Sequence, residues 1–133
     1  MKVKREIAYI SGPMEGYPDY NFLAFMEAEE KWKDEFTIIN PARTVANPGV
    51  DSREHLLGMD FVNVIRSQVI IMLSGFCSSE GAVAELIVAQ QTGIRVIMSD
   101  TGEEIKQNVL KDLLATSVFA AIHTSEAVGD EYQ

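Results

Sequence analysis

Residues 69–73 read Val-Ile-Ile-Met-Leu, a continuous apolar run that begins with three β-branched side chains. A run of this kind is typical of a strand buried on both faces, as in a parallel sheet. On both sides of it, similar short apolar segments alternate with longer segments of helical periodicity. The predicted strands cover residues 7–10, 37–40, 69–73, 94–98 and 118–122, and the predicted helices cover residues 22–36, 51–67, 80–92 and 103–115.

The alternation of strands and helices predicts the fold class. Strict alternation with short loops is typical of an α/β fold, here a parallel sheet of five strands with helices on both faces. Right-handed crossovers favour the flavodoxin-like strand order 2-1-3-4-5. In that order, ligands bind beyond the carboxyl ends of strands 1 and 3. The loops at 11–14 and 74–81, both containing Ser and Gly, are therefore predicted to lie at a ligand crevice.

Length and composition predict one globular domain. The chain has 133 residues, of which 47% are hydrophobic, and we expect a single domain over 1–133 with a polar tail at 123–133. The net charge of −9 argues against binding of a nucleic acid polymer, which relies on Lys and Arg. No apolar run approaches the ~18 residues of a membrane span and no signal peptide is visible. We therefore expect no membrane association and a cytoplasmic location.

Neither a metal nor a cofactor is expected. Cys77 is the single cysteine, which excludes an internal disulfide and a thiolate cluster. His55 and His123 lack metal-ligand spacing to each other and to Cys77. The loop before residue 80 matches neither Gly-x-Gly-x-x-Gly nor a Walker loop.

A carboxylate lies inside the apolar helix predicted over residues 80–92. None of the residues three and four positions from Glu85 is basic, so no local salt bridge accounts for it. Two interpretations are open: a solvated side chain at the helix rim, or a carboxylate held in the crevice. In the second, Glu85 could attack C1′ of a ribosyl group through an oxocarbenium-like transition state and form a glycosyl ester.

Three other positions could complete such a site. The first turn after Ser79 could hold an anion through its N–H groups, although Ser79 could equally be a simple N-cap. Asp60 lies among the apolar residues of its helix, where it could assist glycosidic chemistry or merely follow a break at Gly58. Tyr9 lies near the end of the first predicted strand, and its phenol could reach the crevice or belong to the core.

Four motifs together resemble a known superfamily. Residues 9–14 read Tyr-Ile-Ser-Gly-Pro-Met, residues 40–42 read Asn-Pro-Ala, Asp60 follows, and Ser79-x-Gly81-x-x-x-Glu85 comes last. In this order they resemble the nucleoside 2-deoxyribosyltransferase superfamily, which includes the 2′-deoxynucleoside 5′-phosphate N-hydrolases, and most of all a small phage and bacterial branch. The resemblance spans about residues 7–98. It implies a Rossmann-like domain that acts on an N-glycosidic bond and forms a homodimer or larger homo-oligomer.

The resemblance also implies roles for single residues. Glu85 matches the nucleophile, and Asp60 matches an aspartate that contacts the sugar or base. Tyr9 and Ser11 match first-loop residues near the ribose and phosphate, and Ser79 matches the serine that binds the 5′-phosphate in the hydrolase branch. The expected catalytic residues are thus Glu85, Asp60 and Tyr9, and the expected substrate-binding residues are Ser11, Gly12, Met14, Ser79 and Gly81. One departure concerns the first loop, where the hydrolases often carry a basic residue and this chain has Met14 and Glu15.

We therefore expect an enzyme that cleaves the N-glycosidic bond of 2′-deoxynucleosides or their 5′-monophosphates, by hydrolysis or by deoxyribosyl transfer. Its partner is then a small nucleoside or nucleotide. Two alternatives stay open at this stage. The crevice could bind or sequester a nucleotide without turning it over, or the chain could be a phosphoribohydrolase that acts on ribonucleoside monophosphates.

Overall fold

Five strands form one sheet in the order β2-β1-β3-β4-β5. The computed structural model describes residues 4–43 and 53–115, the side chains of 53–59 excepted. The strands are β1 (Ile7–Ser11), β2 (Thr37–Ile39), β3 (Val69–Met72), β4 (Arg95–Met98) and β5 (Glu104–Ile105). β1 pairs in parallel with β2 and β3, and β3 pairs in parallel with β4. The predicted α/β fold class and strand order are confirmed.

The fifth strand differs from the predicted one. β5 pairs antiparallel to β4, so the sheet is mixed, and the helix predicted to begin at Glu103 begins only at 107. The cause is a tight turn after β4, in which Gly102 takes φ +72 and its N–H donates to the carbonyl of Met98. This turn reverses the chain and lays Ile105 beside Val96. The strand predicted over 118–122 and the tail at 123–133 lie outside the described residues.

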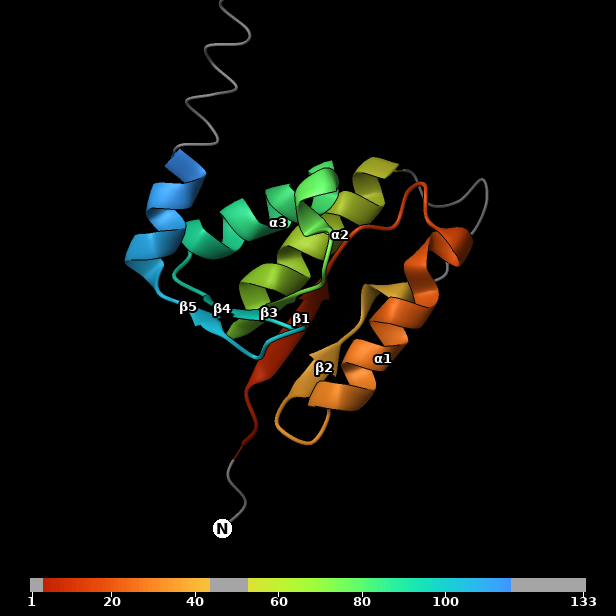
Figure 1. The fold of residues 1–133 in the computed structure, drawn as a ribbon, viewed down its shortest axis with the longest axis horizontal. Helices are drawn as coiled ribbons and strands as arrows, with labels where there is room; N and C mark the ends of the chain where they lie inside the picture. The colour runs from red at the N-terminus through yellow and green to blue at the C-terminus, as the bar shows by residue number, and fades with distance from the viewer. Residues whose placement is uncertain (1–3, 44–52, 116–133) are drawn as a thin grey trace, which may run out of the picture.

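Helices cover both faces of the sheet (Figure 1). They are α1 (Phe22–Trp32), α2 (Arg53–Arg66) and α3 (Glu80–Gln91), with short 3-10 turns η1 (Pro18–Asn21), η2 (Pro41–Arg43) and η3 (Phe76–Ser78) and a last helix over 107–115. α1 lies on one face, and α2, α3 and the last helix lie on the other (Figure 1). α2 runs through Gly58 without a break, which the sequence had left open as a possibility.

The alternation of side chains along β1 decides which face each residue joins. Ala8 and Ile10 belong to the core under α1, whereas Tyr9 belongs to the core under α2 and α3. Successive side chains of a strand point to opposite faces, so Ser11, two residues beyond Tyr9, is directed to the same face as Tyr9. Both hydroxyl side chains are therefore directed towards α3.

The end of β1 passes so close to the end of β3 that only glycine fits at position 12. A Cβ on Gly12 would lie 2.7 Å from the Cβ of Leu73. We expect Gly12→Ala to lower the free energy of unfolding by about 1–3 kcal/mol, because backbone or side chain must move. Urea unfolding measures this. The matched control is Gly81→Ala, where the nearest atom to an added Cβ is 3.9 Å away and helix propensity should raise stability. A Gly12→Ala protein as stable as the wild type would contradict this account.

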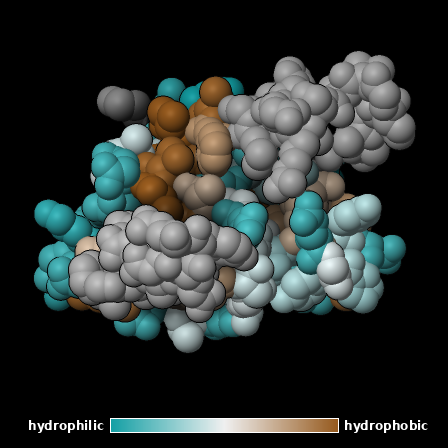
Figure 2. Space-filling view, turned by 90° about the horizontal axis from the view of Figure 1, so that it is seen from above, coloured by the Kyte–Doolittle hydropathy of each residue, from teal (hydrophilic) through white to brown (hydrophobic). Residues whose placement is uncertain are grey.

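On the face seen from above, the coloured residues are largely hydrophilic, with an apolar area beside the grey region (Figure 2). Large apolar side chains that are exposed include Val62 and Ile65 on α2 and Ile87 on α3. Within the described residues, no helix is both long and apolar enough to cross a bilayer. The predicted homo-oligomer stays a prediction.

Candidate functional site

A cleft of about 720 Å³ opens at the carboxyl ends of β1 and β3, where the strand order predicted a ligand crevice. One side is formed by the loop after β1 and the other by the start of α3. The residues that line it are Tyr9, Gly12, Pro13, Met14, Glu15, Phe25, Pro41, Asp60, Ser78, Ser79, Glu80, Gly81, Ala82 and Glu85. This volume is large enough for a nucleoside-sized ligand.

Glu85 is the buried carboxyl of this cleft. Its side chain is 7% exposed, so it is not a solvated residue on the rim of α3. The Tyr9 hydroxyl donates to its Oε2 at 2.5 Å, and the Ser11 hydroxyl donates to its Oε1 at 2.8 Å. No Lys or Arg of the described part forms a salt bridge with it. Two neutral hydroxyl donors thus hold one carboxyl group, with each oxygen keeping a further lone pair.

Burial raises the pKa of Glu85 to about 7, because the charged form loses hydration. The hydrogen bonds from Tyr9 and Ser11 favour the carboxylate and oppose this rise, while the nearby Asp60 adds to it. Burial also raises the pKa of Tyr9 far above its usual value, helped by the charge of Glu85. The phenol therefore stays protonated and acts as a donor at any physiological pH.

Asp60 comes from α2 and is half-buried at the same cleft. Burial raises its pKa, and a hydrogen bond with Tyr9 opposes that rise. The Tyr9 hydroxyl therefore interacts with both Glu85 and Asp60. Asp60 is a second carboxyl group of the site rather than a residue of a helix break.

Ser79 caps α3 and also lines the cleft. Its Oγ accepts the N–H of Ala82 at 3.1 Å, which is the ordinary role of an N-cap serine. Gly81, in the first turn, leaves open space beside Ser79. The capping interpretation is therefore observed, and any ligand contact of Ser79 is a separate prediction.

The structure gathers the predicted site residues into one place. Those that line the cleft are Tyr9, Gly12, Met14, Asp60, Ser79, Gly81 and Glu85. Ser11 is fully buried and does not line it. Its hydroxyl is bonded to Glu85, so Ser11 is placed to position that carboxyl group rather than to touch a ligand.

Sequence reasoning did not single out three apolar residues that line the cleft, Pro13, Phe25 and Pro41. Pro13 and Pro41 stand inside the Ser-Gly-Pro-Met and Asn-Pro-Ala motifs, so the motifs could have indicated them. Phe25 gave no such signal, because its helical spacing fits an ordinary core residue.

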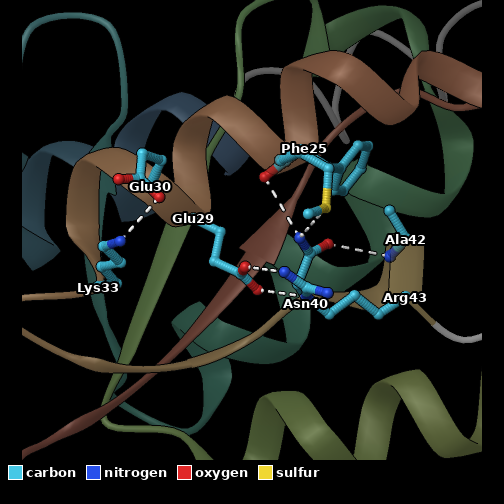
Figure 3. Close-up of polar contacts among 8 residues, drawn as sticks. Phe25, Glu29, Glu30, Lys33, Asn40, Ala42 and Arg43 are labelled. Atoms are coloured by element: carbon cyan, nitrogen blue, oxygen red, sulfur yellow. Dashed lines mark hydrogen bonds and ion pairs between the residues drawn. The ribbon is translucent and has the colours of Figure 1, made fainter.

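Asn40 connects Phe25 of α1 to the segment that contains Pro41 (Figure 3). Its Nδ2 donates to the carbonyl oxygen of Phe25 at 3.3 Å, and its Oδ1 accepts the N–H of Ala42 at 3.0 Å. One residue further on, Arg43 forms an ion pair with Glu29 of α1 (Figure 3). The amide of Asn40 thus fixes Pro41 against α1 and gives the cleft one ordered apolar side.

No group of three His, Cys, Asp or Glu side chains within the described ranges is arranged to hold a metal ion.

Comparisons with known proteins agree with the fold. The structure is similar to the "Crystal structure of conserved protein from Enterococcus faecalis V583", with a TM-score of 0.56 and 20% sequence identity. The match covers 71% of this chain and 63% of that chain, so this chain spans less than two-thirds of its length. No curated protein matches the sequence at a significant level. Residues 6–98, which include every residue that lines the cleft, match the family described as "Domain of unknown function (DUF4406)". The chain belongs to this DUF4406 family.

Proposed function

We propose that this protein is an enzyme that cleaves the N-glycosidic bond of a 2′-deoxynucleoside or its 5′-monophosphate, with Glu85 as the nucleophile. The observation that carries the proposal is the Glu85 carboxyl, buried at the inner end of an open cleft and held by two hydroxyl donors instead of a cation. Burying a carboxyl without a charged partner is costly, and such costs are typical of functional sites. The resemblance to the nucleoside 2-deoxyribosyltransferases supports the same role.

The reaction proceeds in two steps at C1′. A Glu85 oxygen bonds to C1′ while the C1′–N bond breaks, and the electron pair of the C1′–N bond leaves with the base. The base takes a proton from Asp60. Water then attacks C1′, the bond to Glu85 breaks, and the electron pair returns to the carboxylate. Asp60 takes the proton from the water, which restores the starting state. A second base in place of water gives deoxyribosyl transfer.

Tyr9 and Ser11 hold the nucleophile through one hydrogen bond to each oxygen. We expect Tyr9→Phe and Ser11→Ala each to slow base release at neutral pH by about 10- to 100-fold, the range for a hydrogen bond to a charged group. Each substitution also removes a bond that favours the carboxylate, so the pH at which activity is half-maximal should rise. Steady-state rates over a pH series measure both effects. An unchanged pH midpoint in both variants would contradict the assigned role.

A chromatographic assay tests the proposed function. The protein is incubated with the four common 2′-deoxynucleosides, their 5′-monophosphates and the matching ribo compounds, with and without a free acceptor base. We expect a released or exchanged base from at least one deoxyribo substrate. Full recovery of every substrate at high protein concentration would instead support a binding or sequestering protein. Cleavage restricted to ribonucleoside monophosphates would support a phosphoribohydrolase.

A further inference from the structure

We propose that the cleft selects an uncharged nucleoside with a free 5′-hydroxyl and discriminates against the 5′-monophosphate. The reaction at C1′ is that of the proposed function, on which this inference rests. The selection depends on other residues, namely the carboxyl groups near the mouth of the cleft and the first turn of α3.

Among the described side chains, four carboxyl groups line the cleft: Glu15, Asp60, Glu80 and Glu85. Glu85 is buried and Asp60 half-buried, whereas Glu15 and Glu80 are exposed, which places these two nearer the mouth. Glu15 belongs to the loop after β1, and Glu80 belongs to the first turn of α3. The described side chains that line the cleft include no Lys, Arg or His.

A 5′-phosphate would bring up to about two further negative charges among these carboxylates. Charges repel more strongly in a partly enclosed cleft than in bulk water, because less solvent screens them. The net charge of −9 adds a repulsive field around the whole molecule. The charges of Glu15 and Glu80 thus oppose an anionic ligand near the mouth of the cleft, where Asp60, protonated in the starting state of the reaction, adds none.

The start of α3 has little left to offer a phosphate. A helix begins with four N–H groups that lack a partner within the helix. Here the N–H of Ser79 donates to the carbonyl of Phe76 at 3.0 Å, and that of Ala82 donates to the Ser79 hydroxyl at 3.1 Å. Glu80 already places a carboxylate where the helix dipole favours an anion. The N–H groups of Glu80 and Gly81 are left for a ligand, together with the hydroxyl hydrogen of Ser79, whose Oγ only accepts in the bond to Ala82.

A sugar hydroxyl suits this lining better than a phosphate does. Ionised carboxylates only accept hydrogen bonds, and a phosphate dianion also only accepts them. A hydroxyl can donate to Glu80 or Glu15 and accept one backbone N–H at the same time. The apolar side of the cleft, with Met14 and Phe25, offers a surface for the uncharged base.

Titration calorimetry tests the selection on the Glu85→Gln protein, which should bind without turnover. The probes are each 2′-deoxynucleoside and its 5′-monophosphate, at low and at high salt. At low salt, we expect the nucleoside to bind at least about tenfold more tightly than its 5′-monophosphate. This difference should shrink at high salt, because salt screens the repulsion. When Glu15→Gln and Glu80→Gln are added to the Glu85→Gln protein, the ratio of the two affinities should shift several-fold towards the monophosphate. The matched control is Glu27→Gln, an exposed residue of α1 outside the cleft, which should leave the ratio unchanged.

The outcomes separate this inference from the proposed function. Tighter binding of the monophosphate would overturn the selection, and so would an equal shift of the affinity ratio in the Glu27→Gln control. The proposed function would still stand if the wild type released base. Selective nucleoside binding without base release by the wild type would keep the selection and overturn the function. Failure of both ligands to bind would overturn the selection, and failure of the wild type to release base would in addition overturn the function.

Discussion

Replacement of Glu85 by Gln should abolish base release, with a loss on the order of 10³-fold or more in kcat/KM. The amide has nearly the shape of the carboxyl group but cannot form the bond to C1′. It also keeps an oxygen that can accept from Tyr9 or Ser11, so the variant should fold. Base release is followed by chromatography under single-turnover conditions. Wild-type rates in this variant would remove the proposed nucleophile.

Two controls make that result specific to position 85. Circular dichroism and thermal unfolding show whether the variant is folded. Glu27→Gln makes the same chemical change on the exposed side of α1, away from the cleft, and should leave base release unchanged. A loss of activity in both variants would point to a general effect of charge rather than to loss of the nucleophile.

Activity and stability should change in opposite directions with pH. The nucleophile must be the carboxylate, so base release should rise with pH around the raised pKa of Glu85, about 7. Stability should fall over the range from the ordinary value of 4.5 to about 7. In that range the folded chain still binds the proton that the unfolded chain has lost, so raising the pH favours unfolding.

The shift corresponds to about 3 kcal/mol of stability, present at low pH and lost by about pH 8. Other carboxyl groups also titrate, so the useful quantity is the difference in unfolding free energy between Glu85→Gln and the wild type. From about pH 4 to about pH 8, the Glu85→Gln protein should gain about 3 kcal/mol of unfolding free energy relative to the wild type, measured by urea unfolding. A difference that stays constant with pH would show that burial does not raise the pKa of Glu85.

Much of the site could be predicted because it depends on features that the sequence contains. Strand order places the loops after β1 and β3 at one end of the sheet, which brought Tyr9 and Glu85 together across 76 positions. The hydrogen bond from Ser11 to Glu85 was not predicted, since Ser11 was expected to bind substrate, although the period of two in β1 directs Tyr9 and Ser11 to one face. The acidic lining was visible in part through Glu15 of the loop after β1.

The remaining features depend on geometry that local patterns do not encode. Glu104 and Ile105 became a strand because the turn at Gly102 laid them beside β4, not because two residues carry a strand pattern. Phe25 has the spacing of a core residue and is one, yet it also borders the cleft. Its second role exists because Asn40 fixes η2 against its carbonyl group.

The short strands at both edges of the sheet have a consequence for solubility and assembly. Long edge strands with unpaired N–H and C=O groups are templates for aggregation. Here β2 has three residues and β5 has two, and Arg95 beside β5 pairs with Glu104 and Glu6. Such brief edges, the one at β5 also charged, offer a second copy little backbone to pair with. Extension of the sheet by a second copy is therefore disfavoured at the edges that the structure describes.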